Sequence, residues 1–96
     1  MLSREDFVFT IGYDGPVAVV DNQAKHRYGT LSTKALAEKG FFRAAYASAI
    51  YAQDQEAVKL VVDIYNNLAG TSYTLDSPLD RLFGVFLVEV SRSIVL

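Results

Sequence analysis

The residues best suited to bind a charged ligand form one short basic run. A lysine, a histidine and an arginine in succession can hold a phosphate or an acidic partner through charge-assisted hydrogen bonds. The histidine is the only one in the chain, so no second imidazole is present to share a metal ion with it. No nucleophile-elbow motif of a Ser-His-Asp hydrolase is present either. We therefore predict no metal site and no catalytic residue, and take as candidate binding residues Lys25, His26, Arg27 and Tyr28.

A second possible chemistry is phosphate binding by the glycines of IGYDGPVAVVD, residues 11–21. A phosphate-binding loop follows a buried strand and opens a helix, whose N–H groups point at the anion. Here Pro16 and a run of valines follow the glycines, and Asp14 would repel an anion. This stretch therefore favours a turn between two strands over a phosphate site.

The turn indicates a β-hairpin over residues 1–22. Phe7–Tyr13 alternates apolar residues at every second position, which is typical of a half-buried strand. Val17–Val20 is short and β-branched, which also favours a strand. Asp-Gly is a strong signal for a two-residue hairpin loop, because both positions need positive φ. With Asp14-Gly15 as that loop, the predicted pairs are Tyr13–Pro16, Ile11–Ala18 and Phe9–Val20.

Residues 21–29 are polar and predict a connector, after which residues 30–96 are mainly helical. Thr30 or Ser32 can cap the first helix, and Gly40 suits the left-handed position after its end. Residues 41–69 form one helix or two, with Asp54 as the expected break. The sequence Ser77-Pro78-Leu79-Asp80 predicts a helix start with a serine cap and proline in the first turn. Residues 85–96 favour a helix and leave a third strand beside the hairpin as the alternative.

The segment FFRAAYASAIYA adds two candidate binding residues, Arg43 and Tyr46. Arg43 is its only charged residue, and the hydroxyl of Tyr46 can line a pocket between helices. Alanines lie beside the aromatic stripe of this segment, at positions 45, 49 and 52. Small residues allow another backbone to approach closely, so this face is a candidate contact surface.

Two families share features with this region. AEKGFFRAAYASAIYA resembles the second half of a tetratricopeptide repeat, through Gly40, Phe42, Ala45, Ala49 and Ala52. The first half of that pattern and a second copy are missing, so the resemblance implies only a closely packed pair of helices. LSTKALAEKGFFRAAYASAI is similar to a helix-turn-helix, with one residue fewer between the alanine and the glycine. That resemblance implies a DNA-binding regulator, with the hairpin as its wing.

The composition of the chain limits the number of domains, the class of partner and the location that we expect. A chain of 96 residues predicts one domain, 1–96, and its 51% hydrophobic content is generous for that size. Because excess apolar surface usually ends in an interface, we expect a homo-oligomer. A net charge of −2 argues against nucleic acid as the partner, and no apolar run is long enough for a membrane. The absence of cysteine excludes disulfides and thiolate sites. No signal peptide is recognisable, so we expect a cytoplasmic protein.

The sequence therefore predicts an α+β fold, in which an N-terminal hairpin packs on three or four helices. The leading functional hypothesis is a non-enzymatic interaction module without a cofactor, which binds itself or another protein. One alternative is a small-molecule binder with a pocket between the hairpin and the helices. The other is a small winged helix-turn-helix-like DNA-binding regulator.

Overall fold

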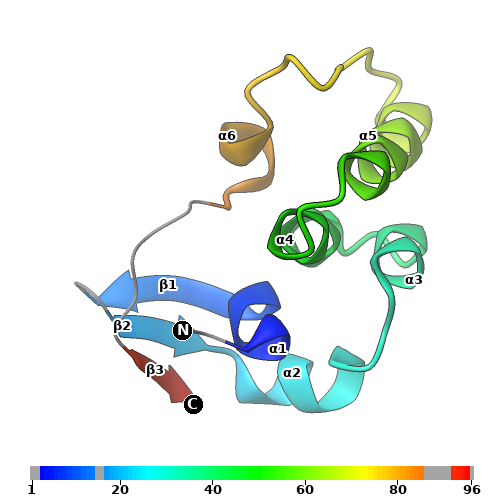
Figure 1. Cartoon of the computed structure of the whole chain (residues 1–96). Helices are drawn as coiled ribbons and strands as arrows, with labels where there is room; N and C mark the ends of the chain where they lie inside the picture. The colour runs from blue at the N-terminus through cyan, green and yellow to red at the C-terminus, as the bar shows by residue number, and fades with distance from the viewer. Residues whose placement is uncertain (1–2, 15–16, 86–91, 96) are drawn as a thin grey trace. The chain divides into compact units, whose positions relative to one another are not determined.

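The computed structural model describes residues 3–14, 17–85 and 92–95, and these form an α+β fold. The elements follow one another as α1 (Arg4–Val8), β1 (Thr10–Asp14), β2 (Val17–Val20), α2 (Asn22–Tyr28), α3 (Thr33–Glu38), α4 (Phe42–Tyr51), α5 (Gln55–Ala69), α6 (Leu79–Phe83) and β3 (Arg92–Val95) (Figure 1). Two compact units divide the chain. The first contains Met1–Thr30 and Leu87–Leu96, and the second contains Leu31–Phe86.

The first unit contains the predicted hairpin, whose two strands pair antiparallel. Its register differs from the prediction, because Asp14 pairs with Val17 and Tyr13 pairs with Ala18. The loop residues are therefore 15 and 16, which lie outside the described part of the chain. From Gly12 to Asp14 the shift is two positions, which keeps the same side chains on each face of a strand. Ala18 and Val20 are accordingly fully buried, and Val17 and Val19 are half-buried.

The beginning of the predicted first strand is wrong, because residues 4–8 form helix α1. The Ser3 side chain accepts a hydrogen bond from the Asp6 N–H at 3.2 Å and so caps this helix. Acidic residues in its first turn stabilise the helix, because they lie near the positive end of the helix dipole. The strand then begins at Thr10, and Ile11 is an extra residue between the Thr10–Val20 and Gly12–Val19 pairs. This bulge leaves Ile11 exposed, although the predicted alternation placed it on the buried face.

The predicted connector at residues 21–29 is also wrong, because most of it forms helix α2. Asp21 caps this helix by accepting a hydrogen bond from the Ala24 N–H at 3.2 Å. Its three basic residues lie in the last turn, where positive charge stabilises the carbonyl end of a helix. In this unit, helix α1 contacts both α2 and strand β2.

Strand β3 completes the sheet of the first unit, in the order β1-β2-β3. It pairs parallel to β2, from Val17–Arg92 to Val20–Val95. A helix was the favoured prediction for residues 85–96, and it is wrong at Arg92–Val95. Residues 86–91 lie outside the described residues.

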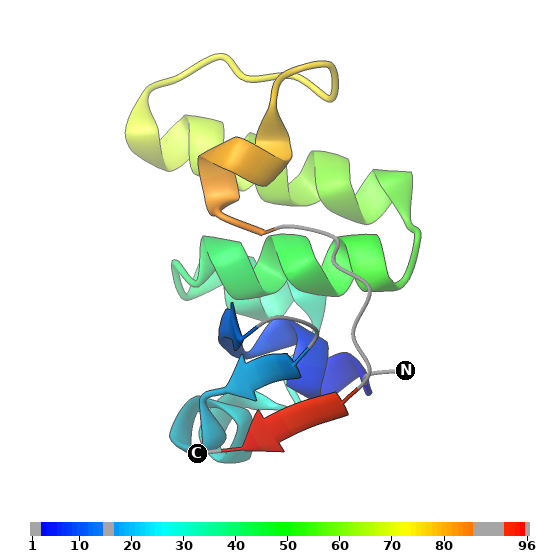
Figure 2. The same cartoon turned by 90° about the vertical axis from the view of Figure 1, so that its left-hand side faces the viewer.

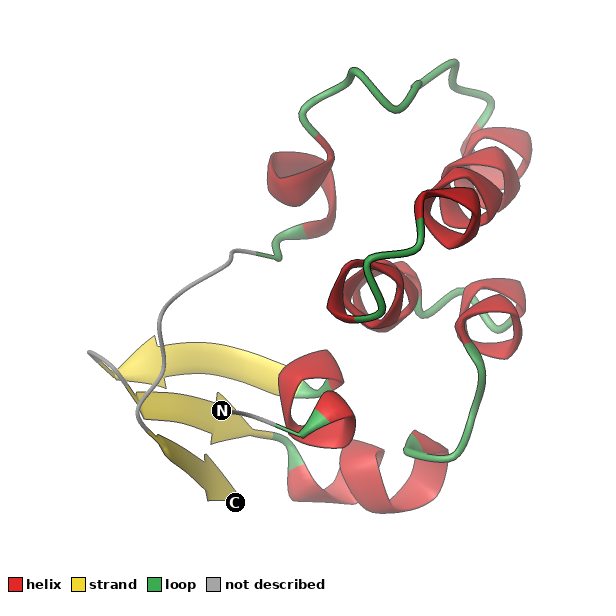
Figure 3. Cartoon of the chain, viewed as in Figure 1, coloured by secondary structure: helices red, strands yellow, loops and turns green. Residues whose placement is uncertain are grey.

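The second unit is helical, as Figure 3 shows by its red ribbons. The Ser32 side chain caps α3, and Gly40 follows that helix with a φ of 84°, both as predicted. Helices α4 and α5 are separate and lie side by side (Figure 2). Asp54 caps α5, which confirms the predicted break.

The core of the second unit is made by α3, α4 and α5, which contact one another. Leu36, Ala45, Ala49 and Val61 are fully buried. Thr33 and Ser48 add a hydrogen bond of 2.8 Å between α3 and α4. Near the end of α5 the side chains leave this core, and Leu68 is 73% exposed.

Helix α6 begins at Leu79, one residue later than predicted. Ser77 does not cap it. Its Oγ instead accepts a hydrogen bond from the Thr74 N–H at 3.0 Å, within the preceding loop. Gly84 ends α6 in the left-handed conformation, with a φ of 70°. Among the described residues, no helix is both long and apolar enough to cross a membrane.

Candidate functional site

One polar contact in the interior of the second unit is centred on Tyr46. Helix α4 places this side chain in the interior, where it is only 6% exposed. Its ring packs against Phe83 of α6 at 5.0 Å between centroids. Its hydroxyl donates a hydrogen bond to Oδ1 of Asp80, in the first turn of α6. One side chain therefore joins α4 to α6 by both an aromatic and a polar contact.

An aromatic cluster surrounds this contact. Phe83 lies against Phe42 at 6.4 Å and against Tyr65 at 5.4 Å, the latter edge to face. Tyr65 also meets Phe42 at 5.1 Å and Tyr73 at 6.0 Å. Edge-to-face and offset pairs are the favoured arrangements of aromatic rings. The cluster fixes α6 to α4 and α5, so the position of Asp80 is set by packing.

The surroundings of Tyr46 raise the pKa of its phenol well above the ordinary value of 10.0. Burial is the largest cause, because it disfavours the charged phenolate. The hydrogen bond to Asp80 and the negative charge of that carboxylate act in the same direction. Tyr46 therefore stays protonated and remains a hydrogen-bond donor to Asp80 throughout the physiological range.

A pocket of about 570 Å³ opens beside this pair. Its wall is formed by Tyr46, by the loop before α6 and by the first turn of α6. Apolar surface comes from Leu75, Pro78 and Leu79, and polar groups come from Ser77, Asp80 and Arg81. A largely apolar lining with a few placed polar groups is typical of small-molecule sites.

The loop that lines this pocket is held by Asn66 of α5. The Asn66 amide nitrogen donates to the Tyr73 carbonyl at 2.8 Å. Its oxygen accepts from the Thr71 hydroxyl at 2.8 Å and from the Tyr73 N–H at 2.9 Å. One amide side chain thus satisfies three groups of an otherwise irregular segment.

A second, smaller pocket of about 330 Å³ is lined by α5 and by the same loop. Leu75 lines both pockets. In the smaller one, the charged residues Lys59 and Asp63 form an exposed ion pair with each other at 3.3 Å. These two charges therefore neutralise each other.

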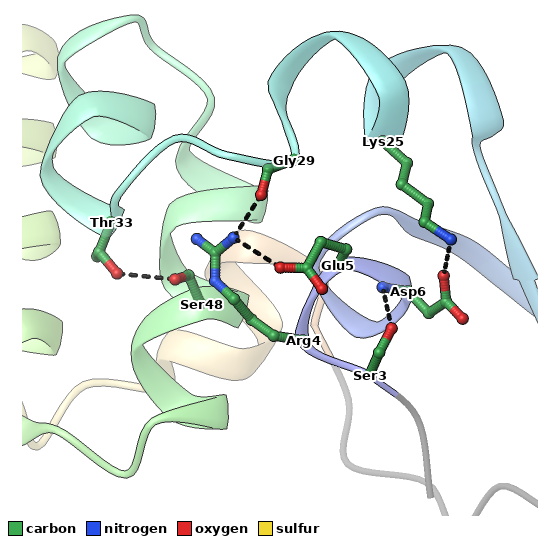
Figure 4. A network of polar contacts seen from close by, with 8 residues as sticks. All are labelled: Ser3, Arg4, Glu5, Asp6, Lys25, Gly29, Thr33 and Ser48. Carbon is green, nitrogen blue, oxygen red and sulfur yellow. Dashed lines mark hydrogen bonds and ion pairs between the residues drawn. The ribbon is translucent and has the colours of Figure 1, made fainter.

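The basic run predicted as a binding site lies on α2 of the first unit. Lys25 is used within that unit, because its ammonium pairs with Asp6 of α1 at 2.6 Å (Figure 4). Arg27 lies over the ring of Tyr28 at 6.0 Å and is exposed, as is His26. The α1–α2 contact is reinforced by Arg4, which donates to the Gly29 carbonyl at 2.9 Å (Figure 4).

The remaining predicted site residue, Arg43, is exposed on α4. It lies on the helix that the helix-turn-helix resemblance assigns to base recognition. Residues 45–49 of that helix are all buried, whereas a recognition helix must expose a face to the groove. The six predicted residues are therefore divided between the units: four on α2, and Arg43 and Tyr46 on α4.

The sequence indicated Tyr46 and a pocket between helices, but not the partner of its hydroxyl or the other residues of the pocket wall. Asp80 stood out only as the acid of a helix start, and 34 residues separate it from Tyr46. Nothing in the sequence pattern indicated Arg81 or Leu75 as pocket residues. A single sequence contains no pattern that links such distant positions, so only the fold brings them together.

Metal binding finds no support in the described residues, where no group of three or more potential ligand side chains could hold an ion. No protein-family model, curated protein or solved structure matches this chain. Function must therefore be argued from the chemistry of the surfaces and the pocket.

Proposed function

We propose that this protein is a non-enzymatic, cytoplasmic interaction module, which acts as a homodimer or as a small subunit of a larger assembly. Its apolar content, 51% in 96 residues, supports this role. So do several large apolar side chains that lie on the surface. These are Ile11, Phe41, Tyr51, Leu68 and Leu75.

The observation that carries the proposal is the position of β1 at the edge of its sheet. In the order β1-β2-β3, no described strand pairs with the other side of β1. Proteins commonly protect such an edge with lysine, proline or a bulge. Strand β1 has a bulge, but its five residues include no lysine or proline, and the bulged residue is an isoleucine with 50% exposure. We assign this edge to a second copy of the chain, with β1 strands paired about a two-fold axis.

The alanine-rich face of α4 does not support the same role. Ala45 and Ala49 have no exposed surface, and α4 contacts α3 and α5. Ala45 and Ala49 serve close helix packing within the second unit, and of the three alanines only Ala52 is exposed to a partner.

Light scattering behind a sizing column, over a dilution series, tests the proposal. We expect a dimer, and we expect the substitution Ile11→Lys to raise its dissociation constant by about tenfold or more, since a charge opposes both edge pairing and apolar burial. Leu68→Lys is the matched control, because it places the same charge on an exposed leucine of the second unit. A monomer at all concentrations contradicts self-association. Equal effects of the two substitutions contradict the assignment to β1.

Small-molecule binding is the second candidate function. It is supported by the pocket of about 570 Å³ beside Tyr46 and Asp80, which lies within the second unit. Thermal unfolding in the presence of a metabolite panel tests it, because a ligand that binds only the native state raises the melting temperature.

A further inference from the structure

The pocket beside Tyr46 presents opposite charges from neighbouring residues. Asp80 and Arg81 both line it and both are exposed. Within the described residues, neither Asp80 nor Arg81 forms an ion pair. A carboxylate and a guanidinium therefore face the same space without neutralising each other.

The carboxylate is also held in place. Oδ1 of Asp80 accepts the hydrogen bond from the buried Tyr46 hydroxyl. Oδ2 accepts no hydrogen bond from the described residues, so it remains available to a ligand. Because Tyr46 is fixed by the ring of Phe83, the orientation of the carboxylate is set before a ligand arrives.

The same pocket has apolar lining residues that a ligand side chain can contact. Leu75 is 44% exposed, and Pro78 is exposed beside it in the lining. The volume of about 570 Å³ falls within the range of about 300–1,000 Å³ that is usual for small-molecule pockets.

From these three features we infer that the pocket binds a small zwitterion, namely a free α-amino acid with an apolar side chain. The ammonium group of the ligand pairs with Oδ2 of Asp80, and its carboxylate accepts from the Arg81 guanidinium. The side chain contacts Leu75 and Pro78. This site belongs to the second unit and does not depend on the pairing of β1 strands.

Titration of the protein with L-leucine, followed by NMR chemical shifts, tests the inference. We expect saturable shifts of the amides of residues 75–81. Two analogues that each lack one charge serve as ligand controls: 3-methylbutylamine lacks the carboxylate, and 4-methylpentanoate lacks the ammonium group. Each is expected to bind about tenfold more weakly or worse, which is the usual effect of losing one charge-assisted contact.

Protein variants complete the test. Asp80→Asn keeps an oxygen that accepts from Tyr46 and removes only the charge, and Arg81→Gln removes the other charge. Both are expected to weaken L-leucine binding by about tenfold. The matched controls are Glu38→Gln and Lys39→Gln, exposed residues of the same unit, which should bind L-leucine unchanged.

Two results would overturn the inference. One is the absence of saturable shifts with L-leucine. The other is equal binding of L-leucine by the Asp80→Asn and Arg81→Gln variants and by their controls. Neither result bears on the oligomeric state, so a failure here is distinguishable from a failure of the proposed interaction module.

Discussion

A hydroxyl group inside an aromatic cluster needs a partner, because an unsatisfied buried donor costs about 1–3 kcal/mol. Tyr46 finds this partner in Asp80. The arrangement has a consequence for stability, since the same surroundings that bury the phenol also resist its ionisation.

The raised pKa of Tyr46 predicts a loss of stability in alkaline solution. Below the ordinary value of 10.0, the phenol is protonated in both the folded and the unfolded chain. Above that value the unfolded chain releases its proton first, so rising pH favours unfolding. We expect the urea midpoint to fall between about pH 8 and about pH 10.5. The fall should be smaller in Tyr46→Phe, which lacks the titrating group.

Tyr65→Phe is the matched control for this experiment. It removes a hydroxyl from the same aromatic cluster, one without a hydrogen bond to any described residue. Its urea midpoint should depend on pH as in the natural chain. If Tyr46→Phe were to show the same dependence as Tyr65→Phe, the link between Tyr46 ionisation and stability would be refuted.

At the level of single residues, the sequence indicated which side chains make polar contacts better than it indicated the groups that they contact. For Tyr46 the sequence predicted a hydroxyl that can line a pocket between helices. In the structure Tyr46 is buried, it lines a pocket, and its hydroxyl donates to Asp80. Lys25 was expected to bind a partner molecule, and it instead pairs with Asp6 of the preceding helix. Charge and size can be read from the sequence, but the group that satisfies a charge is decided by how the elements pack.

At the level of elements, helix caps explain most of the boundaries. Asp54 accepts hydrogen bonds from the Glu56 N–H at 3.0 Å and from the Ala57 N–H at 3.1 Å. These bonds satisfy two of the free N–H groups at the start of α5, the longest helix described. The same residue separates α5 from α4.

Asp54→Ala should therefore destabilise the second unit by about 1 kcal/mol, the usual cost of losing an N-cap. Urea unfolding followed by circular dichroism measures this change. Asp63→Ala, on the exposed face of the same helix, is the control, because its ion pair with Lys59 is worth about 0–1 kcal/mol. An Asp54→Ala change no larger than that of Asp63→Ala would show that the cap contributes little here.

The elements that the sequence missed are the short ones. Helices α1 and α2 have five and seven residues, too few to produce a helical apolar period. Their N-cap residues, Ser3 and Asp21, are of types that commonly cap helices, but a cap residue without an apolar period does not predict a helix. The alternation of Phe7, Phe9 and Ile11 suggested a strand, and the local capping of α1 prevailed over it.

At the level of the whole molecule, the first unit is built from two distant parts of the chain. Strand β3, near the end of the sequence, pairs with β2 of the hairpin. A two-stranded hairpin alone is only marginally stable, and a third strand supplies a further hydrogen-bonded ladder.

Removal of residues 92–96 should accordingly loosen the hairpin. We expect the amides of β1 and β2 to exchange with deuterium at least about tenfold faster, because β2 loses its parallel partner. Amides of α4 and α5 serve as the internal control and should keep their exchange rates, since those helices belong to the other unit. Unchanged protection of β2 would contradict a stabilising role of β3.

The fold class could be predicted from the order of the segments, with β-branched runs first and helical patterns after. The parallel pairing of β2 with β3 could not, because an apolar run of this length fits a helix or a strand equally well. What decides between them is a pairing partner, β2, which is separated from β3 in the sequence by the whole second unit.

The same topology sets an order of events during synthesis. The ribosome delivers β1 and β2 first, then all the residues of α3 to α6, and only then β3. The sheet therefore lacks its third strand until the whole second unit has been synthesised, and the edge of β2 that β3 occupies stays open until then. A protein made in this order gives a chaperone, or a neighbouring nascent chain, a defined interval in which to engage β2.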